Sequence, residues 1–242
     1  MIRIAVVYEA PADLEIATVL ADRVLCEGSD WMEDYLAHKR TWLSTSAKGR
    51  SLTWKGIKRL ALEAGVTAEG HFGRERESGS PDARAARRAI LYLLREYPDL
   101  DAVVLIRDQD DQPGRRHGLE QARSEEHGEL RIVVGLAIVE RECWVISGFD
   151  PRSPEEESRL QSERATLGFD PRDKSHELTA CKDDTAKRSP KRVLRALSDG
   201  DPERERRCWR DTPLSVLRDR GEHNGLADYL AEVHGRLAPL IG

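Results

Sequence analysis

The sequence predicts an α/β protein with a mainly parallel sheet flanked by helices on both faces. Short apolar runs rich in β-branched residues, at residues 2–8, 102–106 and 130–139, are typical of buried parallel strands. The segments between them carry apolar residues at helical spacing. Strands that alternate with helices are joined by right-handed crossovers, and these crossovers make neighbouring strands parallel.

The first strand is expected to stop at Glu9, at the end of the apolar run over residues 2–8. Pro11 then breaks the extended chain, and apolar residues return at helical spacing up to about Gly28. The order of elements is therefore strand, turn and helix, which begins a βα unit.

Residues 31–79 carry a weaker pattern. An irregular stretch is predicted first, followed by a helix from about Thr53 to Ala64 that ends at Gly65. Residues 70–79 are rich in glycine and charged side chains, and we expect a loop there.

A second βα repeat follows. Ser80 is a predicted N-cap and Pro81 occupies the first position of the next helix. The strand over residues 102–106 ends at Asp108, and a loop leads to a helix predicted over residues 115–126.

The remainder of the chain has no strand pattern. Prolines mark predicted turns and helix starts, and the last helix carries one apolar stripe. We predict an α/β core over residues 1–150 and a helical, basic extension over residues 151–242 that packs on the core. The stripe consists of Leu226, Leu230, Val233 and Leu237.

Composition excludes several classes of protein. The 242 residues, of which 39% are hydrophobic, suit one large globular domain or a core domain with an appended piece. No run approaches the roughly 18 apolar residues of a membrane helix, and the first residues do not form a signal peptide, so we expect a cytoplasmic protein that does not contact membranes. The four cysteines lie far apart, and we expect ordinary buried thiols.

Carboxylates follow two of the predicted strands. Glu9 and Asp13 come after the first strand, and Asp108, Asp110 and Asp111 come at the end of a later one. The carboxyl ends of parallel strands share one edge of a sheet, where ligands of such sheets bind. Carboxylates gathered closely repel one another unless a cation separates them, and hard oxygen ligands select Mg²⁺ or Mn²⁺. The sequence therefore predicts a divalent metal site.

Glu140 and Glu142 follow the third apolar run and are candidates for an outer metal ligand or a ligand-orienting role. Structural roles remain open for all these acids. A glutamate at a strand end is often a salt-bridge partner, an Asp-rich loop often makes Asx turns, and acids stabilise helix N-termini.

Three segments together resemble a known family. The segment Tyr8-Glu9-Ala10-Pro11-Ala12-Asp13 and the segment Val104 to Asp110 are similar to the single glutamate and the DxD motif of the Toprim fold. The segment Ile138 to Trp144 is similar to the E-x-E-x-W element of small Toprim-like proteins related to the overcoming-lysogenization-defect nucleases. The resemblance covers roughly the first 150 residues.

The resemblance implies Mg²⁺- or Mn²⁺-dependent hydrolysis of phosphodiester bonds in DNA or RNA, in phage defence or DNA repair, with a separately encoded ATPase as partner. Glu9 would act as general acid/base or ligand, Asp108 and Asp110 would hold metal, and Asp13 could ligate a second ion. The alternative is a Toprim-like module without turnover that binds or regulates an ATPase complex.

A basic segment supplies candidate phosphate contacts. The whole chain has a net charge of -5, but residues 182–195 hold six basic and two acidic side chains. A solvated helix face explains such a run equally well. The candidates for contact with nucleic acid are Lys182, Lys187, Arg188, Lys191 and Arg192.

Two other enzyme classes fit less well. A hydrolase of phosphorylated small molecules lacks support, since the sequence has no GxSxG, Walker lysine loop or GxGxxG, and a haloacid-dehalogenase-type DxD would follow the first strand. A PIN-type nuclease would ordinarily open with Asp at that strand, where this chain has Glu9.

Overall fold

The computed structural model describes residues 1–242 except 29–30, 69, 74–76 and 126. The chain divides into two compact units. The first unit comprises residues 1–107, 112–135 and 232–242, and the second comprises residues 108–111 and 136–231. This division differs from the predicted boundary at residue 150, because the turn and helix that follow the last strand group with the C-terminal helices.

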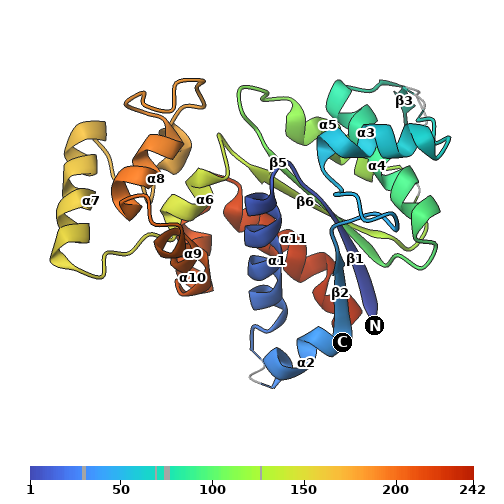
Figure 1. Ribbon diagram of the computed structural model, residues 1–242, viewed down its shortest axis with the longest axis horizontal. Coiled ribbons are helices and arrows are strands. Elements are labelled where there is room, and N and C mark those ends of the chain that lie inside the picture. Colours follow the sequence, from blue (N-terminus) through green and yellow to red (C-terminus); the bar gives the residue numbers. More distant parts are fainter. Residues whose placement is uncertain (29–30, 69, 74–76, 126) are drawn as a thin grey trace. The chain divides into compact units, whose positions relative to one another are not determined.

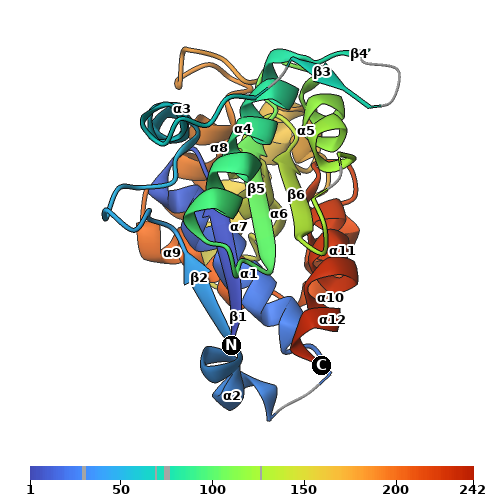
Figure 2. The same ribbon diagram turned by 90° about the vertical axis from the view of Figure 1, so that its right-hand side faces the viewer.

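Four strands form the main sheet, in the order β2-β1-β5-β6 and all parallel. Figure 2 shows them side by side. The predicted α/β class with a parallel sheet is therefore confirmed. The strands are β1 (Ile2–Val7), β2 (Arg40–Leu43), β5 (Ala102–Asp108) and β6 (Arg131–Ala137).

The central strands are buried as their sequences predict. Val6 pairs with Val104 in the register of β1 and β5, and both side chains are almost fully excluded from solvent. Helix α1 (Pro11–Leu25) lies on one side of the sheet and α4 (Pro81–Glu96) on the other (Figure 1). Covering both faces explains why these strands are continuous apolar runs rather than alternating ones.

The starts of the helices in the first unit follow from local chemistry. The Ser80 hydroxyl accepts a hydrogen bond from the Ala83 N–H at 3.1 Å, which confirms the predicted cap of α4. The Thr53 side chain likewise caps α3 (Trp54–Glu63), close to its predicted bounds. Helix α5 (Arg115–Arg123) ends three residues earlier than predicted.

Several short elements were not predicted. Helix α2 (Met32–Lys39) and the edge strand β2 lie in the stretch expected to be irregular. All four residues of β2 are only partly buried, so their sequence lacks an apolar run. The expected loop over residues 70–79 contains the antiparallel pair of β3 (His71–Phe72) and β4 (Glu77–Ser78).

The second unit is helical, as predicted for the C-terminal part. Proline occupies the first turn of three of its helices, since a missing N–H costs nothing there. Helices α7 and α8 lie beside each other (Figure 1). The helices that lie wholly in this unit are α6 (Glu142–Ser147), α7 (Pro154–Leu167), the 3₁₀ turn η1 (Ser175–Glu177), α8 (Pro190–Ser198), α9 (Pro202–Arg210) and α10 (Leu214–Arg220).

The chain ends with α11 (Leu226–Arg236) and the short α12 (Ala238–Ile241). The predicted apolar stripe is confirmed, because Leu226, Leu230, Val233 and Leu237 are all buried. Among the described residues, no helix is long and apolar enough to cross a membrane.

A buried amide organises the second unit. Asn224 is fully buried, and its Nδ2 donates to the Ser147 hydroxyl at 2.7 Å and the Ser175 hydroxyl at 2.9 Å. The backbone carbonyl oxygen of Asn224 accepts from Trp144 Nε1 at 2.9 Å and from the Ile138 N–H at 2.8 Å. One residue thereby links α6, η1 and the chain that follows β6.

An ion cluster around Asp170 makes the stability of this unit depend on pH. Arg164 and Arg172 both donate to the Asp170 carboxylate, with Nε of Arg164 at 2.9 Å. Burial by itself would raise the pKa of Asp170, but these hydrogen bonds outweigh burial and lower the pKa to about 2.

We expect Asp170→Asn to lower the free energy of unfolding at pH 7 by about 1–3 kcal/mol. The pKa of Asp170 is lower in the folded chain than in the unfolded chain. The stabilisation is therefore complete above about pH 4 and is lost as the pH falls towards 2. Urea unfolding followed by tryptophan fluorescence at several pH values measures the difference. Asp173→Asn, at a side chain that is 57% exposed, is the control and should change little. A destabilisation by Asp170→Asn that does not depend on pH would contradict this account.

Candidate functional site

The site predicted at the ends of the strands lies partly in the second unit, where two turns are joined by backbone hydrogen bonds. The Gln109 N–H donates to the Ala137 carbonyl at 2.8 Å, and the Asp110 N–H donates to the Val139 carbonyl at 2.9 Å. The chain that leaves β5 and the chain that leaves β6 are therefore held side by side. This arrangement places Asp110 and Glu140 near each other.

Both turns contain a residue in the left-handed region of backbone conformation. Asp110 has φ of 51°, which aspartate tolerates, and Val139 has φ of 71°. A β-branched residue in this region is strained, and Val139 is also buried. Strain of this kind persists only where the surroundings enforce it, and it is concentrated at functional sites.

A cavity of about 440 Å³ opens beside these turns. Its lining combines acidic side chains with two lysines, so both signs of charge face the same space. The lining residues are Asp110, Asp111, Glu140, Ala180, Cys181, Lys182, Asp184 and Lys191.

Glu140 is the most buried acid in this lining, with 7% of its surface exposed. Lys191 Nζ lies 3.6 Å from Glu140 Oε1 and 3.5 Å from Asp184 Oδ1. Burial raises the pKa of Glu140, as do the charges of Glu142 and Asp110, and Lys191 opposes the rise only in part. The charge of Glu140 is therefore only partly compensated by Lys191.

Two other predicted ligands, Asp108 and Glu142, accept hydrogen bonds from Arg141. Its backbone N–H donates to Asp108 Oδ1 at 2.8 Å, and its guanidinium donates to Glu142 Oε1 at 2.7 Å. Asp108 thus accepts a hydrogen bond from the backbone at the start of α6, which is one of the structural roles that the sequence left open.

Glu9 and Asp13 belong to the first unit. Arg107 Nε donates to Glu9 Oε1 at 3.0 Å, and the guanidinium of Arg107 lies over the Trp54 ring. Asp13 is buried and accepts from the Ala10 N–H at 2.7 Å, as in a capping box. β1 and β5 are parallel, as predicted, and are neighbours in the sheet; the meeting of Glu9 with Asp108 and Asp110 stays a prediction.

The five basic candidates have different surroundings. Lys182 and Lys191 line the cavity. Arg192 forms two hydrogen bonds with Glu163, at 2.8 and 2.7 Å, and also donates to the carbonyl of Lys187. The guanidinium of Arg188 lies 5.6 Å from the centre of the Phe169 ring. These contacts favour a structural role for Arg192, and Lys182 and Lys191 are the two candidates that line the cavity.

The donor chemistry of the cavity suits a hard divalent cation. Asp110, Asp111 and Glu140 offer carboxylate oxygens. One cationic group, the ammonium of Lys191, lies 3.6 Å from Glu140 Oε1. Within the described part of the chain, no three or more His, Cys, Asp or Glu side chains are already grouped to hold a metal ion. Binding would therefore require these side chains to turn towards the ion.

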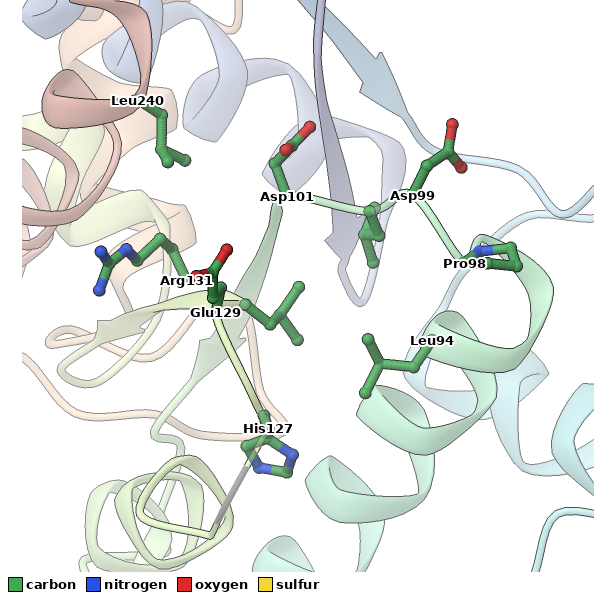
Figure 3. Close-up of a pocket in the computed structure, with 10 residues that line it drawn as sticks. Leu94, Pro98, Asp99, Asp101, His127, Glu129, Arg131 and Leu240 are labelled. Atoms are coloured by element: carbon green, nitrogen blue, oxygen red, sulfur yellow. The ribbon is translucent and has the colours of Figure 1, made fainter.

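The first unit contains a separate cavity of about 600 Å³, at the amino-terminal ends of β5 and β6. Figure 3 shows the Leu94 side chain directed into it and Asp99 and Asp101 at its border. Ligands of parallel sheets bind at the carboxyl ends of strands. The cavity beside Asp110 is therefore the stronger candidate.

Comparisons of the chain with protein-family models, with curated proteins and with solved structures give no match. The assignment of the site therefore depends on its own geometry and chemistry.

Sequence reasoning missed three residues that line the cavity, Ala180 and the polar residues Cys181 and Asp184. In the sequence analysis, Asp184 was included only in the net charge of the basic segment, and its ion pair with Lys191 was not predicted. Cys181 was expected to be an ordinary buried thiol, but it is partly exposed and lines the cavity. That expectation is also wrong for Cys26, which is partly exposed, and it is confirmed for Cys143 and Cys208. No spacing pattern connects residues 181 and 184 with the turns after the strands.

We expect Glu140→Gln to raise the free energy of unfolding at pH 7 by about 0.5 kcal/mol or more. The pKa of Glu140 is raised in the folded chain, so its ionised form opposes folding as the pH rises through and above 4.5. Urea unfolding at pH 7 and pH 4 measures the gain, which should disappear at pH 4.

Glu155→Gln is the matched control. A hydrogen bond with Ser153 lowers the pKa of Glu155, so the same substitution should reduce stability there. A loss of stability in both variants at pH 7 would show that Glu140 is primarily a structural ion-pair partner.

Proposed function

We propose that this protein is a Mg²⁺- or Mn²⁺-dependent nuclease that hydrolyses phosphodiester bonds in DNA or RNA. One observation carries the proposal: Asp110, Asp111 and Glu140, from the turns after two parallel strands, share a cavity with Lys182 and Lys191. Carboxylates that bind a cation, next to ammonium groups that bind phosphate, are what metal-dependent cleavage of a polyanion requires.

Asp110, Asp111 and Glu140 would hold the metal ion. When bound, the ion would neutralise charge on the scissile phosphate and lower the pKa of an attacking water. Lys182 and Lys191 would bind phosphate oxygens and orient the backbone of the nucleic acid. By the resemblance of their sequence positions to the Toprim carboxylates, Glu9 is proposed as general acid/base and Asp108 as a metal ligand.

The Toprim-like fold is part of the same proposal. A parallel sheet with acids after adjacent strands supports it, together with the three sequence segments that resemble the family. A module that binds nucleic acid or an ATPase without turnover is the alternative outcome of the experiments below.

The test is cleavage of supercoiled plasmid, linear duplex DNA and tRNA by the purified full chain, with Mg²⁺, with Mn²⁺ and with EDTA. We expect cleavage of at least one substrate that depends on the metal. Metal binding without cleavage of any of them would favour the non-catalytic module.

We expect Asp110→Asn to reduce metal-dependent cleavage by at least about 100-fold, because it removes a ligand charge. Asp199→Asn is a matched control, since Asp199 also has a left-handed backbone, with φ of 58° against 51° for Asp110, but does not line the cavity. Asparagine tolerates this conformation as aspartate does, so both variants should fold. An equal loss of cleavage in both variants would contradict the proposed role of Asp110.

We expect Lys182→Ala to reduce the salt dependence of binding to duplex DNA. Each lost phosphate contact lowers the slope of log K against log salt by about 0.9. Lys174→Ala removes the same charge from an exposed position outside the basic segment and should leave the slope unchanged. Fluorescence anisotropy of a labelled duplex in EDTA, from low to high salt, measures both. An unchanged slope for Lys182→Ala would exclude that contact.

A further inference from the structure

A second basic surface lies in the first unit, on helix α3. Residues 48–63 hold five basic side chains and one acidic side chain, in a chain whose net charge is -5. Three of the basic residues, Lys55, Lys58 and Arg59, lie at helical spacing on one side of α3 and are exposed. The buried residues of α3 lie on its opposite side, and α3 packs against α4 (Figure 2). We call Lys55, Lys58 and Arg59 the α3 basic face.

The charges of this helix are arranged against its own stability. Lys55 lies in the first turn of α3, where the helix dipole favours acids, and that turn contains no acidic residue. Lys58 and Arg59 follow Lys55 by three and four residues, and like charges at these spacings destabilise a helix. The acid of the segment, Glu63, is the last residue of α3, where the dipole favours cations. Helix stability therefore does not explain the basic face.

Glu63 does not neutralise the two lysines of the face. It accepts two hydrogen bonds from Arg50, at 3.0 and 2.5 Å, and its Oε1 lies 3.8 Å from Arg59 Nε. Among the residues that the structure describes, neither Lys55 nor Lys58 forms an ion pair. Their ammonium groups are therefore available to an external anion.

The α3 basic face begins at the carboxyl edge of the sheet. The Trp54 N–H donates to the Tyr8 carbonyl at 2.9 Å, which fixes the start of α3 to the end of β1. The guanidinium of Arg107 lies 5.0 Å from the centre of the Trp54 ring and donates to Glu9 at 3.0 Å. These contacts, all within the first unit, connect the start of α3 with Glu9, the proposed general acid/base.

The chemistry of the face favours nucleic acid over a lipid surface. A helix that binds a membrane exposes an apolar side next to its basic residues, whereas the apolar side of α3 is buried in the protein. Leu62, at 76% exposure, adds one apolar side chain to the basic face. A polyanion in solution is therefore the partner that the charges fit.

We propose that the α3 basic face binds the phosphate backbone of the nucleic acid that reaches the carboxyl edge of the sheet at Glu9. This inference rests on the proposed function, because it concerns the path of the same substrate. Lys55 and Lys58 contact phosphate oxygens, and such contacts position a nucleic acid without reading its bases. The bound phosphates also offset the repulsion between the like charges of α3.

The test is binding of labelled duplex DNA to the full chain in EDTA, measured by fluorescence anisotropy from low to high salt. We expect the double substitution Lys55→Gln and Lys58→Gln to lower the slope of log K against log salt by about 1.8, since two phosphate contacts are lost. With a labelled single strand the expected reduction is about 1.4. The double substitution Lys55→Arg and Lys58→Arg keeps both charges and should bind as the natural chain does.

The double substitution Lys39→Gln and Lys174→Gln is the matched control, because it removes the same two charges from exposed positions elsewhere. Lys39 directly precedes β2, at the amino-terminal edge of the sheet, and Lys174 belongs to the second unit. Its salt slope should equal that of the natural chain. An equal fall of the slope in this control would attribute the effect to net charge and overturn the specific role of α3.

Stability and kinetics exclude a merely structural role of the lysines. In urea unfolding, the neutral α3 variant should be as stable as the natural chain or more stable, since repulsion within the helix is removed. In cleavage assays with Mg²⁺, the same variant should have a higher KM and an unchanged kcat, because the face binds the substrate and its transition state equally. A marked loss of stability would assign Lys55 and Lys58 a structural role instead.

The outcomes distinguish the two proposals. If the natural chain cleaves nucleic acid and the neutral α3 variant keeps the natural salt slope, the inference fails and the proposed function stands. If the slope falls but no chain cleaves any substrate, the binding face stands and the proposed nuclease fails. Binding to vesicles of phosphatidylcholine and phosphatidylserine that depends on Lys55 and Lys58, with unchanged binding of DNA, would assign the face to a lipid surface and overturn the inference.

Discussion

The second unit depends on the buried amide of Asn224. A buried amide without partners would cost several kcal/mol, so the surrounding chain has to supply its hydrogen bonds. Ser147 and Ser175 accept from the side chain, and the backbone carbonyl accepts from Trp144 and from the Ile138 N–H. Because the bond to Ile138 fixes the chain one residue before the left-handed Val139, the same network sets the direction in which the chain reaches Glu140.

The chemistry of the cavity follows from this backbone. Two turns joined by the Asp110 and Val139 hydrogen bond bring acids from separate strands together, at the cost of strain at a β-branched residue. Burial then makes the charge of Glu140 unfavourable, and Lys191 relieves it only in part. The result is a cavity lined by four carboxylates and two ammonium groups, and the proposal of a divalent cation and a phosphate ligand rests on this lining.

Much of the fold could be predicted because the decisive signals are local. The apolar runs of β1, β5 and β6 indicate strands covered on both faces, and Ser80 with Pro81 indicates the start of α4. The edge strand β2 could not be predicted, since Arg40 to Leu43 become a strand only by pairing with β1. Of the predicted site, the structure places Asp110, Asp111 and Glu140 at one cavity with Lys182 and Lys191, whereas Asp108 and Glu142 bind Arg141.

By itself, the sequence determined the α/β class, the parallel strands and the acids that follow them, because strand burial and helix capping depend on residues close together in the chain. Only the tertiary structure decided which charged groups meet. Lys191 and Glu140 are far apart in sequence, and Asp184 joins them through a segment without a regular pattern. Such contacts depend on the path of the backbone, and a hydrogen bond such as that between Asn224 and Ile138 directs this path without leaving any periodic signal in the sequence.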